Sequence, residues 1–269
     1  MLHVATRSKP RGGGKEISDF LAQAARTKSR ALLLDYDGTL APFCLDRSHA
    51  VPYPAIPPLL EQIRACGDTR LGIVTGRRAC EVIALLGIKH LEIWGCHGLE
   101  RLRADGTYWM PQLDPEALLA MAEADELLAG EGLQELAEYK PAGTAIHWRG
   151  RDGMTAEVRG KVERVWSMLT RREQLSLLIF DGGMEIRVAS RNKGDVVRTV
   201  LAEMGKEACV AYLGDDETDE DAFEALRGHG LGVLVKETHR STQADAWIRP
   251  PEGVIGFLSD WIEACGGSP

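Results

Sequence analysis

Two aspartates at the end of an apolar run are the first residues in the sequence that could do chemistry. Asp35 and Asp37 directly follow RALLL (30–34), and Gly38 and Thr39 come next. Carboxylates two positions apart can divide a displacement reaction between them, because one can attack while its neighbour moves a proton. Taken alone, the pair is equally consistent with a turn in which the side chains cap backbone amides.

Three further stretches carry polar groups in similar positions. Thr75, Gly76 and Arg77 follow the apolar run RLGIV, Lys193 stands where a helical pattern begins, and Asp215 follows CVAYLG. Phosphoryl transfer needs a nucleophile, a hard cation and fixed donors for the phosphoryl oxygens. The threonine and the lysine can donate to those oxygens, a glycine lets the backbone approach closely, and aspartates supply the oxygen ligands that Mg²⁺ prefers.

The acidic run that contains Asp215 reads LGDDETDED. Glu217, Glu220 and Asp221 fit a solvated acidic start of the helix that follows, where the helix dipole favours negative charge. Asp215 comes directly after an apolar strand, which favours a role in a site.

The scaffold of these stretches is predicted by the alternation of apolar runs and helical patterns. From Arg30 the chain repeats a short apolar strand, a polar loop and a helix, and the same rhythm resumes after Val188. Continuous apolar strands that alternate with helices indicate a parallel sheet covered on both faces. Loops at the carboxyl ends of such strands form the binding site, so the stretches should meet there.

The middle of the chain has a different pattern. LRADGTYWM and LSLLIF-DGG-MEIRV read as hairpins, and PEALLAMAEADELLAG reads as an amphipathic helix, which together indicate a small α+β unit with a mainly antiparallel sheet. We therefore predict a flexible tail, a Rossmann-like α/β core in two pieces and an inserted cap, at residues 1–28, 29–107 with 189–269, and 108–188.

Composition narrows the class of protein. The 269 residues carry a net charge of -8, which argues against a nucleic-acid partner. No apolar run approaches the roughly 20 residues that span a bilayer, so we expect no membrane partner. The N-terminus has no apolar segment typical of a signal peptide, and the six cysteines form no C-x-x-C pair. We expect a cytoplasmic monomer with reduced thiols.

DYDGT, VTGR, RNKGD and GDDETDE, in this order, resemble the motifs of the haloacid dehalogenase-like (HAD) phosphatase superfamily. The resemblance implies that Asp35 is the nucleophile and Asp37 the general acid and base. It also implies that Mg²⁺ is held by Asp35, the backbone carbonyl of Asp37 and Asp215, with Asp216 and Asp219 supporting them. Thr75, Gly76 and Lys193 would then bind the phosphoryl group.

Within that superfamily, GCHGLE, EYKPAGTAIHWR and MEIR resemble trehalose-6-phosphate phosphatases. The resemblance implies that Glu138, Lys140 and Glu185 in the cap grip hydroxyls of the distal glucose. His147 and Arg149 match the family's His-aromatic-Arg segment. These two residues, with Arg77, are the remaining expected substrate contacts. Carboxylates and an ammonium group together offer the acceptors and donors that sugar hydroxyls need.

Simpler interpretations of the cap residues remain open. Glu138 and Lys140 could be a surface ion pair, His147 a satisfied histidine, Arg149 a surface charge and Glu185 a solvent-facing strand residue. The predicted function is Mg²⁺-dependent hydrolysis of trehalose 6-phosphate through an aspartyl-phosphate. The alternatives are another glycosyl phosphate as substrate, or a catalytically silent regulatory module, although such a module would usually have lost one of the three key aspartates.

Overall fold

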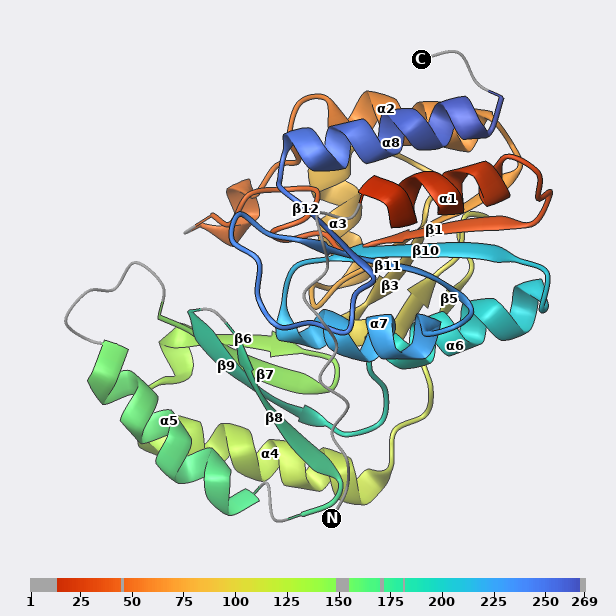
Figure 1. Ribbon diagram of the computed structural model, residues 1–269. Coiled ribbons are helices and arrows are strands. Elements are labelled where there is room, and N and C mark those ends of the chain that lie inside the picture. The colour runs from red at the N-terminus through yellow and green to blue at the C-terminus, as the bar shows by residue number, and fades with distance from the viewer. Residues whose placement is uncertain (1–13, 45, 149–154, 170–171, 181, 267–269) are drawn as a thin grey trace, which may run out of the picture.

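The computed structural model describes residues 14–44, 46–148, 155–169, 172–180 and 182–266, which form two sheets and the helices packed on them (Figure 1). The larger sheet has eight strands in the order β12-β11-β10-β1-β2-β3-β4-β5. Their bounds, in chain order, are β1 (Arg30–Leu34), β2 (Thr69–Val74), β3 (Glu92–Gly95), β4 (Glu100–Leu102), β5 (Tyr108–Trp109), β10 (Cys209–Gly214), β11 (Gly230–Val235) and β12 (Ala246–Ile248). Strands β12 to β3 are parallel, whereas β4 and β5 pair antiparallel.

Helices cover both faces of the large sheet, because its central strands are apolar on both sides. Leu32 and Leu34 of β1 pack toward one set of helices, and Ala31 and Leu33 pack toward the other. The first set is α1 (Gly14–Ala24), α2 (Ile56–Ala65), α3 (Ala79–Leu86) and α8 (Glu252–Ala264). The second set is α6 (Lys193–Met204) and α7 (Glu220–Leu226). This is the doubly covered α/β architecture that the sequence predicted.

The smaller sheet is antiparallel, with the strand order β6-β7-β9-β8. Its elements are β6 (Ala137–Lys140), β7 (Gly143–His147), β8 (Leu175–Phe180) and β9 (Gly183–Val188), with α4 (Pro115–Gly130) and α5 (Thr155–Leu169). Because successive side chains point to opposite faces of a strand, Ile146, Met184 and Ile186 pack on the two helices. The opposite face carries the polar residues and is turned toward the large sheet (Figure 1).

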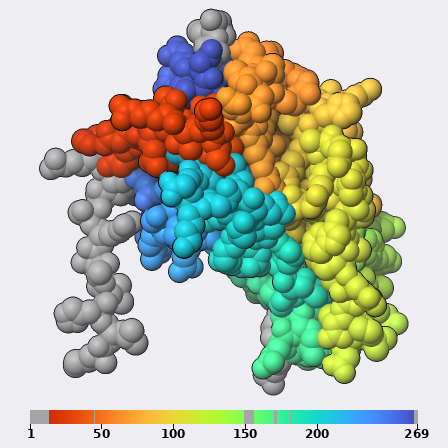
Figure 2. Space-filling model, turned by 90° about the vertical axis from the view of Figure 1, so that its right-hand side faces the viewer, coloured from red at the N-terminus to blue at the C-terminus, as the bar shows by residue number. Residues whose placement is uncertain are grey.

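Two linkers, near residues 110 and 190, connect the two units, and they run side by side (Figure 2). The Arg191 guanidinium lies 5.7 Å from the centre of the Trp109 ring, which ties one crossing to the other. Short 3₁₀ turns occur at η1 (Arg47–His49), η2 (Cys96–Gly98), η3 (Gln134–Leu136) and η4 (Glu217–Asp219).

The observed elements confirm the predicted fold class, but two boundaries differ from the prediction. Residues 14–24 were expected in a flexible tail and instead form α1, because Phe20, Leu21 and Ala24 share an apolar face that packs near α8. Residues 108–109 were expected to open the cap, yet they form the edge strand β5 of the large sheet.

The described residues bear on membrane spanning and on the state of the cysteines. None of the helices they form is long and apolar enough to cross a membrane. All six cysteines lie among them, and each is a free thiol.

Candidate active site

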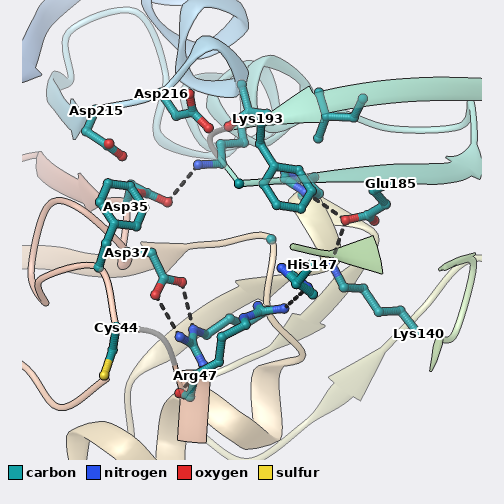
Figure 3. A pocket seen from close by; sticks show the side chains of 18 residues that line it. Asp35, Asp37, Cys44, Arg47, Lys140, His147, Glu185, Lys193, Asp215 and Asp216 are labelled. Atoms are coloured by element: carbon teal, nitrogen blue, oxygen red, sulfur yellow. Dashed lines mark hydrogen bonds and ion pairs between the residues drawn. The ribbon is translucent and has the colours of Figure 1, made fainter. Parts of the chain in front are cut away.

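The carboxyl ends of three adjacent strands bring the first polar residues together. β1 pairs with β10 on one side and with β2 on the other. Asp35, Asp215 and Thr75 directly follow these three strands, and each is at least 96% buried. A pocket opens beside them, between the two sheets, and its polar lining comes from both (Figure 3): Asp35, Asp37, Arg47, Arg77, Lys193, Asp215 and Asp216 from the larger unit, and Lys140, His147 and Glu185 from the smaller sheet.

Gly38 allows the turn after β1 to pack against Asp215. Its φ of 81° lies in the left-handed region, and a Cβ built there would stand 2.4 Å from an Asp215 carboxylate oxygen. Any other residue would push the two aspartate-bearing loops apart. The glycine of the DYDGT stretch therefore sets the distance between the loops of Asp35 and Asp215.

Lys193 is a buried cation that contacts two of the aspartates. Its Nζ donates to Asp35 Oδ1 at 2.6 Å and to Asp219 Oδ1 at 2.8 Å, and the side chain is 3% exposed. Burial alone lowers the pKa of Lys193, but the charges of Asp219 and Asp35 outweigh it and raise the pKa above its ordinary value. The residue begins α6, whose first turn is fixed by reciprocal hydrogen bonds between Asn192 and Asp195.

Asp219 is fully buried, and protein donors occupy both of its carboxylate oxygens. Oδ1 accepts from Lys193 Nζ and from the Tyr212 hydroxyl at 2.6 Å, and Oδ2 accepts from the backbone N–H groups of Asp215 and Asp216 at 3.0 and 2.9 Å. Four donors use the lone pairs that a carboxylate offers. Asp219 therefore fixes the loop that carries Asp215 and has little capacity left for a metal ion.

Asp35 and Asp215 have the capacity that Asp219 lacks. The ligand atoms of the three aspartates lie within 4.8 Å of one another. Asp215 Oδ1 is buried and has no hydrogen-bond partner among the described residues. Burial, and then the charge of Asp35, raise the pKa of Asp215 well above its ordinary range. Buried anions this close call for a cation, and hard oxygen donors suit Mg²⁺ or a similar ion.

Asp37 is held by an arginine. Arg77 Nε and NH2 donate to Asp37 Oδ2 and Oδ1, both at 2.7 Å, and Arg77 NH1 donates to the backbone carbonyl of Arg47 at 2.8 Å. Each guanidinium nitrogen thus has a protein acceptor, and Arg77 is 2% exposed. The sequence predicted Arg77 as a substrate contact. In this arrangement three of its five side-chain N–H groups have protein acceptors, and two of these hold Asp37.

The polar face of the small sheet gathers the predicted cap residues. Glu138 and Glu185 both lie opposite Ala145 in the register, and Lys140 lies two residues beyond Glu138 on the same face. Lys140 Nζ donates to Glu185 Oε2 at 2.5 Å, and both side chains are 4% exposed. Burial alone raises the pKa of Glu185, but Lys140 outweighs it and holds the pKa below its ordinary range. Glu138 Oε2 lies 2.7 Å from His147 Nε2.

Of the remaining predicted residues, Thr75 and Gly76 lie at the end of β2 and Arg149 lies outside the described residues. The Thr75 hydroxyl oxygen accepts from the Arg77 backbone N–H at 3.1 Å, and Gly76 lines the pocket. Arg47 and His97 also line the pocket and were not among the predicted residues. His97 stands in the GCHGLE stretch, which served only as a mark of resemblance, whereas the loop around Arg47 carries no motif.

His97 is buried where the two units meet. Its backbone is left-handed (φ 57°), and its Nε2 lies 3.8 Å from Glu185 Oε2. A Cβ on Gly76 would come within 2.6 Å of that nitrogen, so the glycine is needed for the ring to fit. Burial, and then the charge of Arg187, lower the pKa of His97 to about 4.

Stability should depend on pH through His97. Its pKa is about 4 in the folded protein and 6.5 in the reference state, so the unfolded chain binds more protons between these values. The free energy of unfolding should fall by up to about 3 kcal/mol from this residue as pH drops from 6.5 to 4. Urea denaturation of the wild type and of His97→Asn should show the difference, since asparagine tolerates the left-handed backbone. A wild-type-minus-variant difference that stays constant with pH would contradict the assignment.

The parallel sheet, with aspartates at the ends of β1 and β10 and a lysine that begins α6, is the fold of the haloacid dehalogenase-like superfamily. The chain aligns with a haloacid dehalogenase-like hydrolase from B. subtilis at a TM-score of 0.56 and 15% identity, over 85% of this chain and 98% of that one. Within the superfamily, the sequence model of the trehalose-phosphatase family matches residues 33–248, so the chain belongs to that family and is a phosphatase.

Individual relatives agree with this assignment. The chain is 29% identical over 260 residues to a probable trehalose-phosphate phosphatase of Arabidopsis thaliana, over 90% of this chain and 70% of that protein. It shares the fold of the C-terminal domain of trehalose-6-phosphate phosphatase from C. albicans, with a TM-score of 0.80 at 18% identity, over 97% of this chain and all of that domain.

Proposed function

We propose that the protein hydrolyses trehalose 6-phosphate to trehalose and inorganic phosphate, that it requires Mg²⁺, and that an aspartyl-phosphate is the intermediate. The observation that carries the proposal is the composition of one pocket, with Asp35, Asp37 and Lys193 at one end and Lys140 and Glu185 at the other. The first group suits a phosphoryl centre and the second suits sugar hydroxyls. Family membership supports the same substrate.

In the first step, a carboxylate oxygen of Asp35 attacks phosphorus and the bond from phosphorus to the sugar oxygen breaks. Asp37 gives its proton to that leaving oxygen. In the second step, Asp37 takes a proton from water, the water oxygen attacks the phosphorus of the aspartyl-phosphate, and Asp35 leaves as a free carboxylate. Lys193, Thr75 and the backbone at Gly76 balance and orient the phosphoryl oxygens throughout.

Asp35, the Asp37 backbone carbonyl and Asp215 would hold Mg²⁺, which supplies positive charge next to the phosphoryl oxygens. The unpartnered Asp215 oxygen supports this assignment. Asp219 and Asp216 would support the metal site indirectly by fixing the loop that carries Asp215, since Asp216 caps the turn η4.

We assign Arg77 to orienting Asp37. A bidentate arginine fixes the position of the Asp37 carboxylate, which accepts a proton from water in the second step. For the first step, Asp37 must carry a proton while it remains near the leaving oxygen. The pair therefore has to loosen when substrate fills the pocket.

We propose that residues 111–188 are a cap that selects the substrate, with the boundary set after β5. Glu138, Lys140 and Glu185 would bind hydroxyls of the distal glucose, and His147 would border them. The two glutamates lie in one register row on the same face as Lys140, and Figure 3 shows Lys140 and Glu185 in contact on the side of the pocket away from Asp35.

The proposal is tested by phosphate release from trehalose 6-phosphate, glucose 6-phosphate and sucrose 6-phosphate, with Mg²⁺ or with EDTA. We expect metal-dependent release that is selective for trehalose 6-phosphate. For Glu185→Gln, kcat/KM on trehalose 6-phosphate should fall by about 10- to 100-fold, because a charge-assisted bond to a hydroxyl is lost. Preference for another sugar phosphate would overturn the substrate, and full activity in EDTA would overturn the metal requirement.

A further inference from the structure

Arg47 is a side chain of the large unit that bonds the polar face of the small sheet. Its NH1 lies 2.8 Å from His147 Nε2 and donates to Glu138 Oε2. One terminal guanidinium nitrogen carries two N–H groups, so it can donate to the carboxylate and to the ring nitrogen together. Arg47 stands 91 residues before Glu138, on η1, in the loop that follows the DYDGT stretch.

The turn that carries Arg47 is itself fixed to the core. Asp46 caps η1, because its Oδ1 accepts from the Ser48 backbone N–H at 2.9 Å. The Arg47 carbonyl accepts from Arg77 NH1 at 2.8 Å, and the same guanidinium grips Asp37 through its other two nitrogens. Direct contacts therefore run without a gap from Asp37 through Arg77 and Arg47 to the polar face of the small sheet.

The environment of this contact makes it stronger than an ordinary surface ion pair. The side chains of Arg47 and Glu138 are 28% and 23% exposed, and Arg47 and the neighbouring His147 line the pocket. Charge-assisted hydrogen bonds in such partly buried places contribute more than exposed pairs do. The planar fork of arginine also fixes direction, which a lysine ammonium at the same place could not do as well.

We propose that Arg47 is a positioning residue that holds the small sheet against the large unit and keeps Glu138 aimed over the pocket. The inference rests on the proposed function and deepens it, because Glu138 is a proposed sugar contact. Arg47 acts on the sugar through Glu138 and His147. The turn that carries Arg47 is hydrogen-bonded to Arg77, and Arg77 also holds Asp37. The small sheet and Asp37 are therefore positioned by connected contacts.

The kinetic test compares Arg47→Ala with Arg64→Ala, an exposed arginine on α2 that pairs with Glu61. For Arg47→Ala, kcat/KM on trehalose 6-phosphate should fall by about 10- to 100-fold, mainly through KM, since the closed arrangement is less populated. Turnover of p-nitrophenyl phosphate, which contains no sugar, should change by less than about 3-fold. For Arg47→Lys, kcat/KM on trehalose 6-phosphate should lie between the values for the wild type and for Arg47→Ala. Equal losses on both substrates would overturn the proposal, because Arg47 would then act on the phosphoryl chemistry itself.

Double-mutant cycles test whether the effect of Arg47 on kcat/KM passes through Glu138. Arg47→Ala combined with Glu138→Gln should cost little more than Glu138→Gln alone, because Arg47 acts on the sugar through Glu138. Arg47→Ala combined with Glu185→Gln should show additive losses on a logarithmic scale. Additivity in the first pair would overturn action through Glu138.

A measurement without substrate keeps this proposal separate from the substrate assignment. Hydrogen exchange of backbone amides in residues 46–50 and 137–147 should be faster in Arg47→Ala than in the wild type, and unchanged in Arg64→Ala. If the wild type cleaves p-nitrophenyl phosphate but not trehalose 6-phosphate, the proposed substrate is wrong, and exchange still decides the role of Arg47. Unchanged exchange in both segments would overturn that role.

Discussion

Replacing Asp35 by asparagine is expected to abolish phosphate release, with kcat lowered by at least about 10⁴-fold. The amide has the size and shape of the carboxylate, so the change removes the nucleophile and leaves the packing at the end of β1 intact. Phosphate release should be measured with Mg²⁺ on trehalose 6-phosphate and on p-nitrophenyl phosphate. Retention of the wild-type rate on either substrate would show that another group attacks phosphorus.

The stability of the same variant provides the control for folding. Burial raises the pKa of Asp35 to about 8, so the ionised carboxylate is costly in the metal-free protein. Asp35→Asn removes one of several neighbouring negative charges, and its melting temperature in EDTA should be no lower than that of the wild type. Glu217→Gln is the matched control, because this carboxylate is 68% exposed and should change neither activity nor stability. A large drop in the melting temperature of Asp35→Asn would mean that the inactive protein is misfolded.

Sequence patterns located most of the large unit because its strands are buried on both faces. RALLL and CVAYLG are continuous apolar runs bounded by charged or turn-forming residues, which leaves little choice of register or length. The start of helix α6 was predicted at Lys193, where the structure places it, and Asn192 caps the first turn. The order of the strands then brings Asp35 and Asp215 together without further information.

The misplaced elements depend on contacts distant in the sequence. Residues 108–109 were predicted as part of a hairpin, but which sheet the hairpin joins is decided by the pairing of β4 with β3. β6 was not predicted as a strand. It is an edge strand that carries Glu138 and Lys140 on one face, so the apolar alternation that marks a strand is missing. Polar residues predicted for the site thus stand where apolar residues would have indicated a strand.

The partners of the site residues were the least predictable part. The sequence indicated Asp37 and Arg77 separately, and only the fold shows that the two bind each other. Arg47 reaches the small sheet from a loop whose residues have no periodicity, so nothing in the local sequence distinguishes it from a surface arginine. Motif spacing can identify the groups that react, whereas the groups that orient them are selected by three-dimensional proximity.

Lys193→Met should give the largest loss of stability among these changes. The lysine is 3% exposed and stands between Asp35 and Asp219, so its removal leaves two buried carboxylates without their cation. Breaking a buried pair in this way costs about 3–5 kcal/mol, although methionine preserves most of the side-chain volume. Phosphate release should be lost as well, because a donor to the phosphoryl group is missing. Urea denaturation at pH 7 measures the first effect, with the exposed Lys206→Met as control.

The pH dependence of that loss identifies its cause. If unbalanced charge destabilises Lys193→Met, the deficit relative to the wild type should shrink between pH 7 and pH 5, because proton uptake by the unpaired carboxylates removes the charge that the lysine no longer balances. Added Mg²⁺ should also restore part of the stability, since a bound cation takes over the same role. A deficit that is equal at both pH values and insensitive to Mg²⁺ would instead indicate lost packing, and the lysine would then be a structural residue of α6 rather than the cation of the site.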